Sequence, residues 1–460
     1  MKNTKIVIIG AGSAAFGLSN LIVLMQTPEL RGSTLCLVDI NEKGLNLITG
    51  LAERINRDWD CGFSIKSSTD RKEMLKDADF VLVTVAIDRE ECWRTDHEIA
   101  KKYGILHYAE NGGPGALMHT SRNMALIMPI FRDIEELCPD ALVLNFTNPV
   151  PRISIAAARF TKLKVIGICH QLSFAYVMVG NVLGKDLGLD IPSDYLFRWT
   201  DESLNDYNII RHAAEKKFDI FAAGINHFTW MLSIRDKQTG EDLYPLFKKR
   251  YLEGFNEFEP LTREMFGAFN ICPVPGDCHM VEYLPYTHNM ARNTWEKYDI
   301  QMYTMERANK SREDMWKDIS DMASGKKPID HLRKAQSERA EQIIAGILEN
   351  KYCYEPAVNI PNHGNITNLP ENAIIEVPAV VNASGVCGLA VGNLPEPVAE
   401  LCRRQITVAE LAVEAAVKGD RNIALQALLL DPMIDDPSMA RLMLDEYIEK
   451  GKKYLPQFNK

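Results

Sequence analysis

The sequence lacks the features of a membrane or secreted protein. Its 460 residues contain no run of 18 apolar residues, the length that a membrane-spanning helix needs. The amino-terminal MKNTKIVIIGAG loses its apolar run at Gly10, and no cleavage-type sequence follows, so it does not resemble a signal peptide. The 10 cysteines are scattered without a paired framework. We therefore expect reduced cysteines and a cytoplasmic protein.

An excess of basic charge is also missing. The formal net charge is -10, from 52 Lys and Arg against 62 Asp and Glu. This balance argues against a nucleic-acid or anionic-membrane surface as partner, but leaves a small-molecule ligand open. There is no internal repeat, low-complexity tract or flexible linker. Because the chain is too long for one small core, we expect two lobes packed tightly together.

The first part of the chain alternates apolar strands with helices. The expected strands are 5–9, 34–38, 63–68, 79–86 and 163–170, and 141–149 is expected to hold a further strand together with the loop that follows it. This βαβ spacing predicts a doubly wound parallel sheet of the Rossmann type. The pattern changes to mixed strand and helix near residue 195. The predicted fold is α/β, with a Rossmann-like domain over 1–195 and an α+β domain over 196–460 for substrate, metal and oligomer contacts. The overall arrangement would be that of lactate and malate dehydrogenases.

The segment GAGSAAFG (10–17) follows the first strand and opens a helix. Gly10 and Gly12 permit a tight turn and close approach of backbone N–H groups to a pyrophosphate, which the helix N-terminus also favours. Asp39 ends the second strand, where a carboxylate bonds ribose hydroxyls and repels a 2′-phosphate. The pattern predicts NAD binding. The expected contacts at the loop are Gly10, Gly12, Ser13, Ala14, Ala15 and Phe16.

Polar residues gather after later strands. VIGICHQ (165–171) places Cys169 and His170 at the end of the sixth strand, beside the expected nicotinamide site. A thiolate and an imidazole there suit a divalent metal, and ligand softness alone favours Zn²⁺ or Fe²⁺. Each residue also has a purely structural interpretation: Cys169 could be a core residue and His170 a helix cap. The same holds for three other segments: NFTNPV (145–150) as a turn, GINHFTW (224–230) with a core His227, and PVPGDCHMVEYLPY (273–286) with Asp277 as a helix cap.

Taken together, these segments resemble glycoside hydrolase family 4, the NAD- and metal-dependent glycosidases. The resemblance runs nearly end to end and includes KIVIIGAGSAAF, NFTNPV, GICH, GINHFTW, PGDCHMVEY, NHGNITNLPENAIIEVPAVV (362–381) and AVKGDRNIALQALLLDP (416–432). The family mechanism differs from two-carboxylate hydrolysis. The sugar C3 hydroxyl is oxidised by NAD, the C2 proton is removed, the aglycone leaves, water adds, and the ketone is reduced again.

The resemblance also implies residue roles. Cys169 and His227 would hold the metal, which in this family is generally Mn²⁺, and Asp277 would remove the C2 proton. Asn148 would hold the sugar beside the nicotinamide, and His170 would contact the sugar or assist proton transfer. Further sugar contacts are expected from Glu110 and Asn226. Homologues are commonly oligomeric, so a homodimer or homotetramer is expected.

The resemblance narrows the substrate to a non-phosphorylated glycoside, because family members with His after the metal cysteine act on such sugars. The PGD-x-H-x-x-EY block is similar to the α-galacturonidase, α-glucuronidase and α-glucosidase branch. Cys278 stands where that branch has Arg, and ENGGPGA (110–116) departs from the usual GD-x-x-GPGG through Glu110 and Ala116. Gln171 is another departure. An α-glucoside or an α-hexuronide is therefore expected.

Two other functions are compatible with the same pattern. An ordinary NAD dehydrogenase of a sugar or hydroxy acid would produce NADH and would not need the Cys169–His227 pair. A catalytically silent sensor would bind NAD and sugar without turnover. The presence of candidates for both the metal ligands and the base favours the glycosidase.

Overall fold

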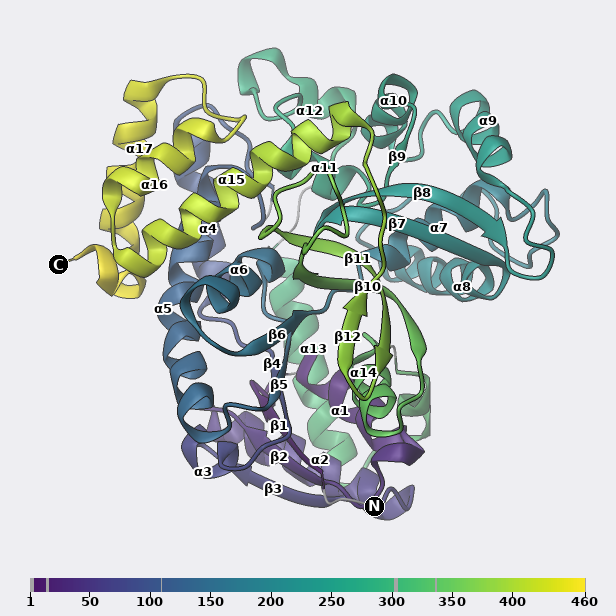
Figure 1. The fold of residues 1–460 in the computed structure, drawn as a ribbon, viewed down its shortest axis with the longest axis vertical. Coiled ribbons are helices and arrows are strands. Elements are labelled where there is room, and N and C mark those ends of the chain that lie inside the picture. The colour runs from purple at the N-terminus through teal and green to yellow at the C-terminus, as the bar shows by residue number, and fades with distance from the viewer. Residues whose placement is uncertain (1–3, 14–15, 109, 302–304, 336, 460) are drawn as a thin grey trace.

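The structure is a computed structural model and describes residues 4–13, 16–108, 110–301, 305–335 and 337–459. Within them, a twelve-stranded sheet runs through the whole molecule, with helices on both sides (Figure 1). The strand order is β3-β2-β1-β4-β5-β6-β10-β11-β7-β8-β9, and β12 pairs with β11. Both lobes predicted from the sequence therefore contribute strands to one sheet.

The parallel part has the strand order of a dinucleotide-binding fold. Its strands are β1 (Lys5–Ile9), β2 (Thr34–Val38), β3 (Ser64–Ser68), β4 (Phe80–Val83), β5 (Leu142–Asn145) and β6 (Lys164–Gly167). The connecting helices are α1 (Phe16–Gln26), α2 (Glu42–Asp58), α3 (Arg71–Leu75), α4 (Arg89–Lys102), α5 (Pro114–Leu137) and α6 (Val150–Phe160). The α/β doubly wound prediction is confirmed. β4 and β6 end three residues earlier than predicted, because the residues after them leave the sheet as loops, and the loop expected within 141–149 begins at Phe146.

Alternating side chains of the parallel strands enter two hydrophobic cores. Ile6 and Ile8 of β1 join the core that contains α1 and α2, whereas Val7 and Ile9 join the core that contains α3, α5 and α6. Successive side chains of a strand point to opposite faces, so a parallel sheet covered on both sides needs such continuous apolar runs. This packing fixes where each strand ends, and thereby where the loops begin.

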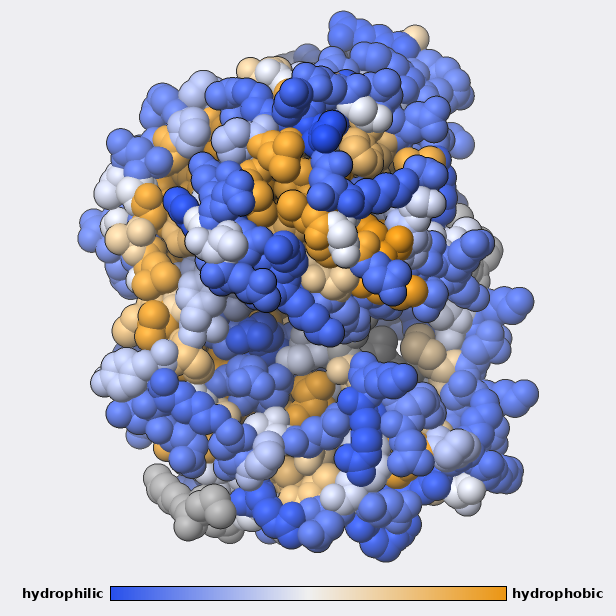
Figure 2. Space-filling view, turned by 90° about the vertical axis from the view of Figure 1, so that its right-hand side faces the viewer, coloured by the Kyte–Doolittle hydropathy of each residue, from blue (hydrophilic) through white to orange (hydrophobic). Residues whose placement is uncertain are grey.

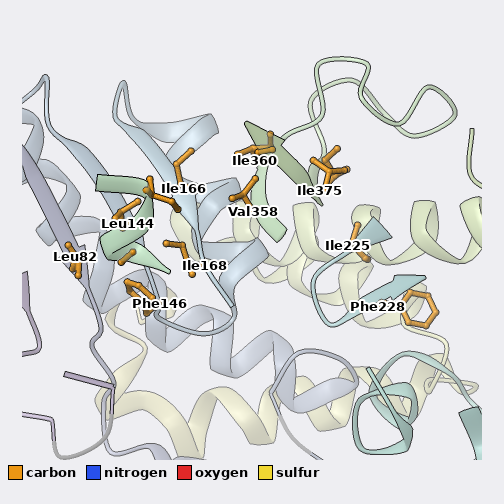
Figure 3. Packing of buried hydrophobic residues seen from close by; sticks show 14 of the residues in the cluster. Leu82, Leu144, Phe146, Ile166, Ile168, Ile225, Phe228, Val358, Ile360 and Ile375 are labelled. Carbon is orange, nitrogen blue, oxygen red and sulfur yellow. The ribbon is translucent and has the colours of Figure 1, made fainter. Parts of the chain in front are cut away.

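The second half of the sheet is antiparallel. Its strands are β7 (Phe218–Ile225), β8 (Phe228–Asp236), β9 (Cys272–Pro273), β10 (Cys353–Pro361), β11 (Ile374–Asn382) and β12 (Gly385–Gly388). The join is made by Asn359 of β10 opposite Gly167 of β6, and by Glu376 of β11 opposite Gly224 of β7. Figure 3 shows apolar side chains of both halves following one another across this join, in a single core.

The later helices cover both halves of the sheet. They are α7 (Leu172–Leu183), α8 (Asp201–Lys217), α9 (Tyr244–Gly254), α10 (Pro260–Phe269), α11 (Asp277–Tyr283), α12 (Thr294–Lys297), α13 (Met305–Ala323), α14 (Ala340–Leu348), α15 (Glu396–Lys418), α16 (Arg421–Leu430) and α17 (Pro437–Gly451). α13 packs on α2, and α15 packs on α5 and α6, so the expected tight packing of the second lobe on the first is present. None of the described helices is long and apolar enough to cross a membrane.

The side of the molecule seen in Figure 2 is mainly hydrophilic in its lower part and carries more apolar residues in its upper part. Between the two parts the surface is hollowed. A separate cavity of about 910 Å³ lies between α6, β6, β10, β12 and α15. None of the residues predicted for the site lines this larger cavity, so its size does not identify the functional site.

Candidate active site

The loop after β1 has the geometry of a dinucleotide-binding turn. Gly10 has φ +92°, and a Cβ there would lie 2.0 Å from the Thr84 carbonyl oxygen, so only glycine fits. The N–H groups of Gly10 and Ala11 donate to the Val38 carbonyl at 2.9 and 3.0 Å, which ties the loop to the end of β2. Ser13 follows in this turn, and its N–H donates to the Gly10 carbonyl at 3.3 Å. Ala14, Ala15 and the Phe16 side chain lie outside the described part of the chain.

Asp39 stands where the sequence predicted the ribose partner. Its Oδ2 accepts a hydrogen bond from the Gly12 N–H at 2.9 Å, and its Oδ1 accepts one from the Asn41 N–H at 2.8 Å. These bonds fix the carboxylate at the end of β2 and leave further lone pairs for hydroxyl donors. The neighbouring Ile40 is 88% exposed. The arrangement suits a ribose whose base lays its flat face against Ile40, and the negative charge of Asp39 opposes a 2′-phosphate.

Cys169 and His227 meet although 58 residues separate them. Cys169 follows β6, and His227 lies in the turn between β7 and β8, so the join of the two half-sheets brings them together. Cys169 Sγ lies 3.1 Å from His227 Nε2. Metal–sulfur and metal–nitrogen bonds of about 2.3 and 2.0–2.1 Å at a right angle would separate the two ligand atoms by about 3.1 Å. The donor types and their separation therefore fit a divalent metal.

The electrostatics of this pair fit the same use. Burial, together with the charge of Glu376, raises the pKa of the Cys169 thiol. Burial, followed by His279 and His170, lowers the pKa of His227, which keeps this imidazole neutral. A neutral imidazole is a metal ligand as it stands, whereas the thiol must release its proton when a cation binds.

Three residues surround His227 that carried no assigned role in the sequence prediction. Asn111 Nδ2 lies 2.8 Å from His227 Nδ1, and the two rings of His227 and His279 have centroids 4.2 Å apart. His279 Nδ1 contacts Glu282 Oε1 at 2.5 Å. Glu282 Oε2 accepts a hydrogen bond from the Asn111 N–H at 2.6 Å, which closes the group. One ligand atom from each of His227, His279 and Glu282 lies within 4.8 Å of the others.

Several buried amide groups of the site have an atom without a hydrogen-bond partner among the described residues. These atoms are Asn111 Oδ1, Asn148 Oδ1, Asn226 Oδ1 and Gln171 Nε2. The Asn226 amide donates to Glu376 Oε2 at 2.7 Å, and Gln171 Oε1 accepts from Thr229 at 3.2 Å. Buried polar atoms are nearly always hydrogen-bonded. A cluster of exceptions is what a site for a hydroxyl-rich ligand requires.

Glu110 is buried, 3% exposed, in the loop before α5. Its Oε2 lies 3.3 Å from an Arg89 guanidinium nitrogen and 3.6 Å from His119 Nε2. Burial raises the pKa of Glu110, although the charge of Arg89 and a hydrogen bond with Asn148 act in the opposite direction. Glu110 and Asn148 are thus brought together, as their predicted roles require. The peptide bond between Asn148 and Pro149 is cis.

His170 is more exposed than the metal pair. Its side chain is 56% exposed, and Nδ1 lies 3.3 Å from Glu338 Oε1. Partial burial lowers the pKa of His170, but the hydrogen bond to Glu338 and the negative charge of Glu338 raise it by more. The pKa of His170 is therefore raised overall. The charge of Arg211 acts against protonation. No local pattern predicts the contact with Glu338, because this residue comes from a segment 168 positions away.

Asp277 lies at the start of α11 and is 7% exposed. Its carboxylate oxygens accept hydrogen bonds from the N–H groups of Leu261 and Thr262, at 3.0 and 2.6 Å, at the start of α10. In return, Glu259 accepts a hydrogen bond from the Asp277 N–H. Burial raises the pKa of Asp277 to about 6, and burial together with the charge of Asp277 raises that of Glu259 to about 8. Among the described residues, the Asp277 carboxylate makes no hydrogen bond with Cys169 or His227.

Comparisons with known proteins identify the family of the chain. Residues 5–184 match the family model described as Family 4 glycosyl hydrolase, and residues 222–434 match that of the Family 4 glycosyl hydrolase C-terminal domain. An alpha-glucosidase from Erwinia rhapontici is 29% identical, over 98% of this chain and 99% of its own. An alpha-galacturonidase from Thermoanaerobacterium saccharolyticum is 26% identical, over 97% of this chain and 95% of its own.

A solved structure shows that the fold is shared. It is a 6-phospho-alpha-glucosidase from gut microorganisms in complex with NAD and Mn²⁺, with a TM-score of 0.79 and 21% identity, and the similarity covers 98% of this chain and 99% of the other. The two family models together span most of the sequence, on both sides of the join in the sheet. The chain therefore belongs to family 4 of the glycosyl hydrolases.

Proposed function

We propose that this family 4 glycosyl hydrolase cleaves a non-phosphorylated glycoside by transient oxidation of the sugar, with NAD as hydride carrier and Mn²⁺ as metal. The observation that carries the proposal is the 3.1 Å contact between Cys169 Sγ and His227 Nε2. The two residues follow or lie between strands of the sheet that also carries the dinucleotide-type loop at Gly10. Ordinary glycosidases, which rely on two carboxylates, have no need of such a pair.

The chain's part in NAD binding follows from the loop after β1. Gly10, Gly12 and Ser13 would present backbone N–H groups and space to the pyrophosphate, and Asp39 would accept hydrogen bonds from the ribose hydroxyls. When bound, NAD supplies an acceptor for the hydride from sugar C3, and the same hydride is given back to C3 after water has added. Asn148, whose buried Oδ1 has no hydrogen-bond partner among the described residues, would hold the sugar in place for this transfer.

Cys169 and His227 would hold the metal. When bound, Mn²⁺ supplies a Lewis acid that stabilises negative charge on the sugar oxygens at C2 and C3. Asp277 is our candidate for the base that removes the C2 proton, because its pKa of about 6 leaves it ionised at neutral pH yet basic enough to accept a proton. Asn226 and Glu110 would bind sugar hydroxyls, and His170, near the metal pair, would contact the sugar or pass on a proton.

The kind of sugar is inferred from the surroundings of His170. Its partner Glu338 is an acid only 11% exposed on its side chain, and this charge would repel a phosphate dianion. A neutral α-glucoside is therefore the substrate that we propose. An alpha-glucosidase and a probable 6-phospho-beta-glucosidase are relatives of the same 29% identity, so the choice rests on Glu338 and not on the degree of identity.

An α-hexuronide is the second candidate, and Arg211 is the observation that favours it. Its side chain lies on α8, is 7% exposed, and has a buried Nε without a hydrogen-bond partner among the described residues. α8 packs on α7, which begins just after His170, and Tyr207 of α8 stacks on Phe174 of α7. The related branch has an Arg at the position of Cys278, and this Arg would bind the sugar carboxylate. In this chain Arg211 could bind the carboxylate instead.

A release assay tests the proposal. Chelator-treated, desalted protein is mixed with nitrophenyl α- and β-glycosides of glucose, galactose, glucuronic acid and galacturonic acid, and with glucose 6-phosphate derivatives. Each is assayed with and without NAD, Mn²⁺ and a thiol reductant. We expect release from the α-glucoside only when both NAD and Mn²⁺ are present. No release on any glycoside, with NADH accumulating on free sugars or hydroxy acids, would identify a dehydrogenase instead.

The domain boundary near residue 195 and the homodimer or homotetramer stay predictions. Residue 195 lies in the loop between α7 and α8, a connection without strand or long helix. We propose that the α+β part beyond this loop carries the oligomer contacts, which sedimentation of the full chain would test.

A further inference from the structure

We propose that His279 is a third protein ligand of the metal and that Glu282 is the carboxylate that orients it. The inference rests on the proposed function, because it assumes that the metal binds at Cys169 and His227. It goes further by assigning a place in the site to two residues of α11 that the family resemblance left without a role.

The position of His279 relative to His227 is the first argument. The ring centroids lie 4.2 Å apart, with the planes inclined by 32°. A nitrogen of each ring and an oxygen of Glu282 lie within 4.8 Å of one another. Two ligands of one ion, each about 2.0–2.2 Å from it, cannot be more than roughly 4.4 Å apart. Cys169 is not part of that group, so the His279 side chain would have to turn toward Cys169 before both imidazoles and the thiolate could bind one ion.

The contact with Glu282 is the second argument. His279 Nδ1 lies 2.5 Å from Glu282 Oε1, so the carboxylate holds the proton at Nδ1 and leaves Nε2 with its lone pair. Metal-ligating histidines almost always have such a carboxylate or carbonyl partner on the other ring nitrogen, which fixes the tautomer and the ring orientation. The 26% exposure of the His279 side chain leaves it accessible to an ion.

Glu282 itself is held firmly. Its side chain is fully buried, and Oε2 accepts a hydrogen bond from the Asn111 N–H at 2.6 Å. The backbone at Gly112 presses against the same turn, since a Cβ there would lie 1.8 Å from the Glu282 carbonyl oxygen. Because both carboxylate oxygens are engaged, Glu282 acts on the metal through His279 and not as a direct ligand.

The resulting donor set suits the proposed chemistry. A second imidazole would give the ion one more donor than the Cys–His pair alone, and should therefore tighten the binding of any divalent metal at this site. With three protein ligands, the metal would still be able to supply Lewis-acid stabilisation to the sugar oxygens. His279 could instead only stack on His227 or only transfer a proton. In either case the metal would have a single imidazole ligand, which the number of bound imidazoles distinguishes from our proposal.

Pulsed EPR of the Mn²⁺-loaded wild-type protein in the presence of NAD tests the inference without any substitution. Full-length protein is prepared with ¹⁵N-labelled histidine, and the remote imidazole nitrogens that couple to Mn²⁺ are counted. We expect two imidazoles. A single imidazole overturns the assignment of His279, whereas no imidazole at all overturns the proposed metal site as well.

Substitutions provide an independent measurement through the EPR signal of free Mn²⁺, which gives the Kd without any turnover. We expect His279→Phe, which keeps a ring, to raise the Kd by more than about 100-fold. Glu282→Gln should raise it by about 10–100-fold, as the loss of an outer partner does. Cys278→Ser, one residue away, is the matched control and should leave the Kd unchanged. NAD binding and circular dichroism verify that each variant is folded.

The outcomes separate the two proposals. If Cys169→Ser and His227→Ala raise the Kd but His279→Phe does not, the third ligand is wrong and the proposed function stands. If none of the three changes the Kd, the metal site of the proposed function is itself contradicted.

Discussion

The side-chain amide of Asn111 lies 2.8 Å from Nδ1 of His227, on the side of the ring away from Cys169. The Asn111 main chain is fixed at both polar groups: its N–H donates to Glu282 and its carbonyl accepts from Arg152 at 2.8 Å. Its Oδ1 has no hydrogen-bond partner among the described residues. A half-turn of the amide would let Oδ1 accept the Nδ1 proton of His227, which leaves Nε2 free to bind a metal beside Cys169.

Asn111→Leu tests this relationship. The variant removes the acceptor for Nδ1 but keeps the main-chain contacts, so we expect the Kd for Mn²⁺ to rise by about 10–100-fold. Asn111→Asp is the matched control, because it retains an acceptor oxygen and should bind Mn²⁺ at least as tightly as the wild type. Equal affinity of all three proteins, measured by titration of the apo form, would show that Asn111 does not orient His227.

Cys169→Ser should separate metal binding from NAD binding. The substitution removes the thiolate ligand, and we expect metal-dependent turnover to fall by at least about 100-fold. The Gly10 loop lies at a different strand end, so the Kd for NAD should stay close to that of the wild type. Full activity of this variant would exclude Cys169 as a metal ligand.

Asp277→Asn tests the assignment of the base. Asparagine keeps one acceptor for the N–H groups at the start of α10 but cannot accept the sugar proton. We expect exchange of the C2 proton with solvent to slow by about 10²–10⁴-fold, the usual contribution of a general base. If exchange continues at the wild-type rate while only thermal stability falls, Asp277 is a helix cap and the base is another residue.

The pKa values of Asp277 and its neighbour Glu259 predict how activity depends on pH. Because the base must be ionised, kcat/KM should fall as the pH drops through the Asp277 pKa of about 6. Burial and the charge of Asp277 raise the pKa of Glu259 to about 8, so Glu259 is uncharged over the range in which Asp277 titrates. Glu259→Gln removes no charge there, and we expect it to leave the acidic limb in place, as should Glu264→Gln at an exposed position on α10. An acidic limb that persists in Asp277→Asn would separate the profile from Asp277.

Much of the first lobe could be predicted from sequence because its signals are local. The apolar runs of β1, β2 and β4 to β6, and the glycine at Gly10, each specify their structure within a few residues. The ends of strands were less predictable. Ile168 and Cys169 continue the apolar run of β6, so the sequence did not mark where the chain leaves the sheet there, whereas the polar residues of NFTNP do mark the end of β5.

The partners inside the site could not be predicted, because they depend on the join of the two half-sheets. The pairing of Asn359 with Gly167 brings Glu376 near Cys169, and no local pattern marks this contact. Glu338 reaches His170 in the same way, from a loop distant in sequence. The Asp277 side chain accepts hydrogen bonds from N–H groups at the start of α10. The sequence interpretation of Asp277 as a helix cap is therefore right about the kind of contact, but the capped helix is α10 and not α11, in which Asp277 lies.

The most direct test of the redox mechanism is the fate of the hydrogen at sugar C2. Nitrophenyl α-glucoside is hydrolysed in D₂O by the full-length protein with NAD and Mn²⁺, and the released glucose is analysed by NMR while NADH absorbance is followed. We expect deuterium at C2, no release without NAD, and no net NADH. Release that proceeds without NAD, or glucose that retains all of its C2 hydrogen, would contradict the mechanism.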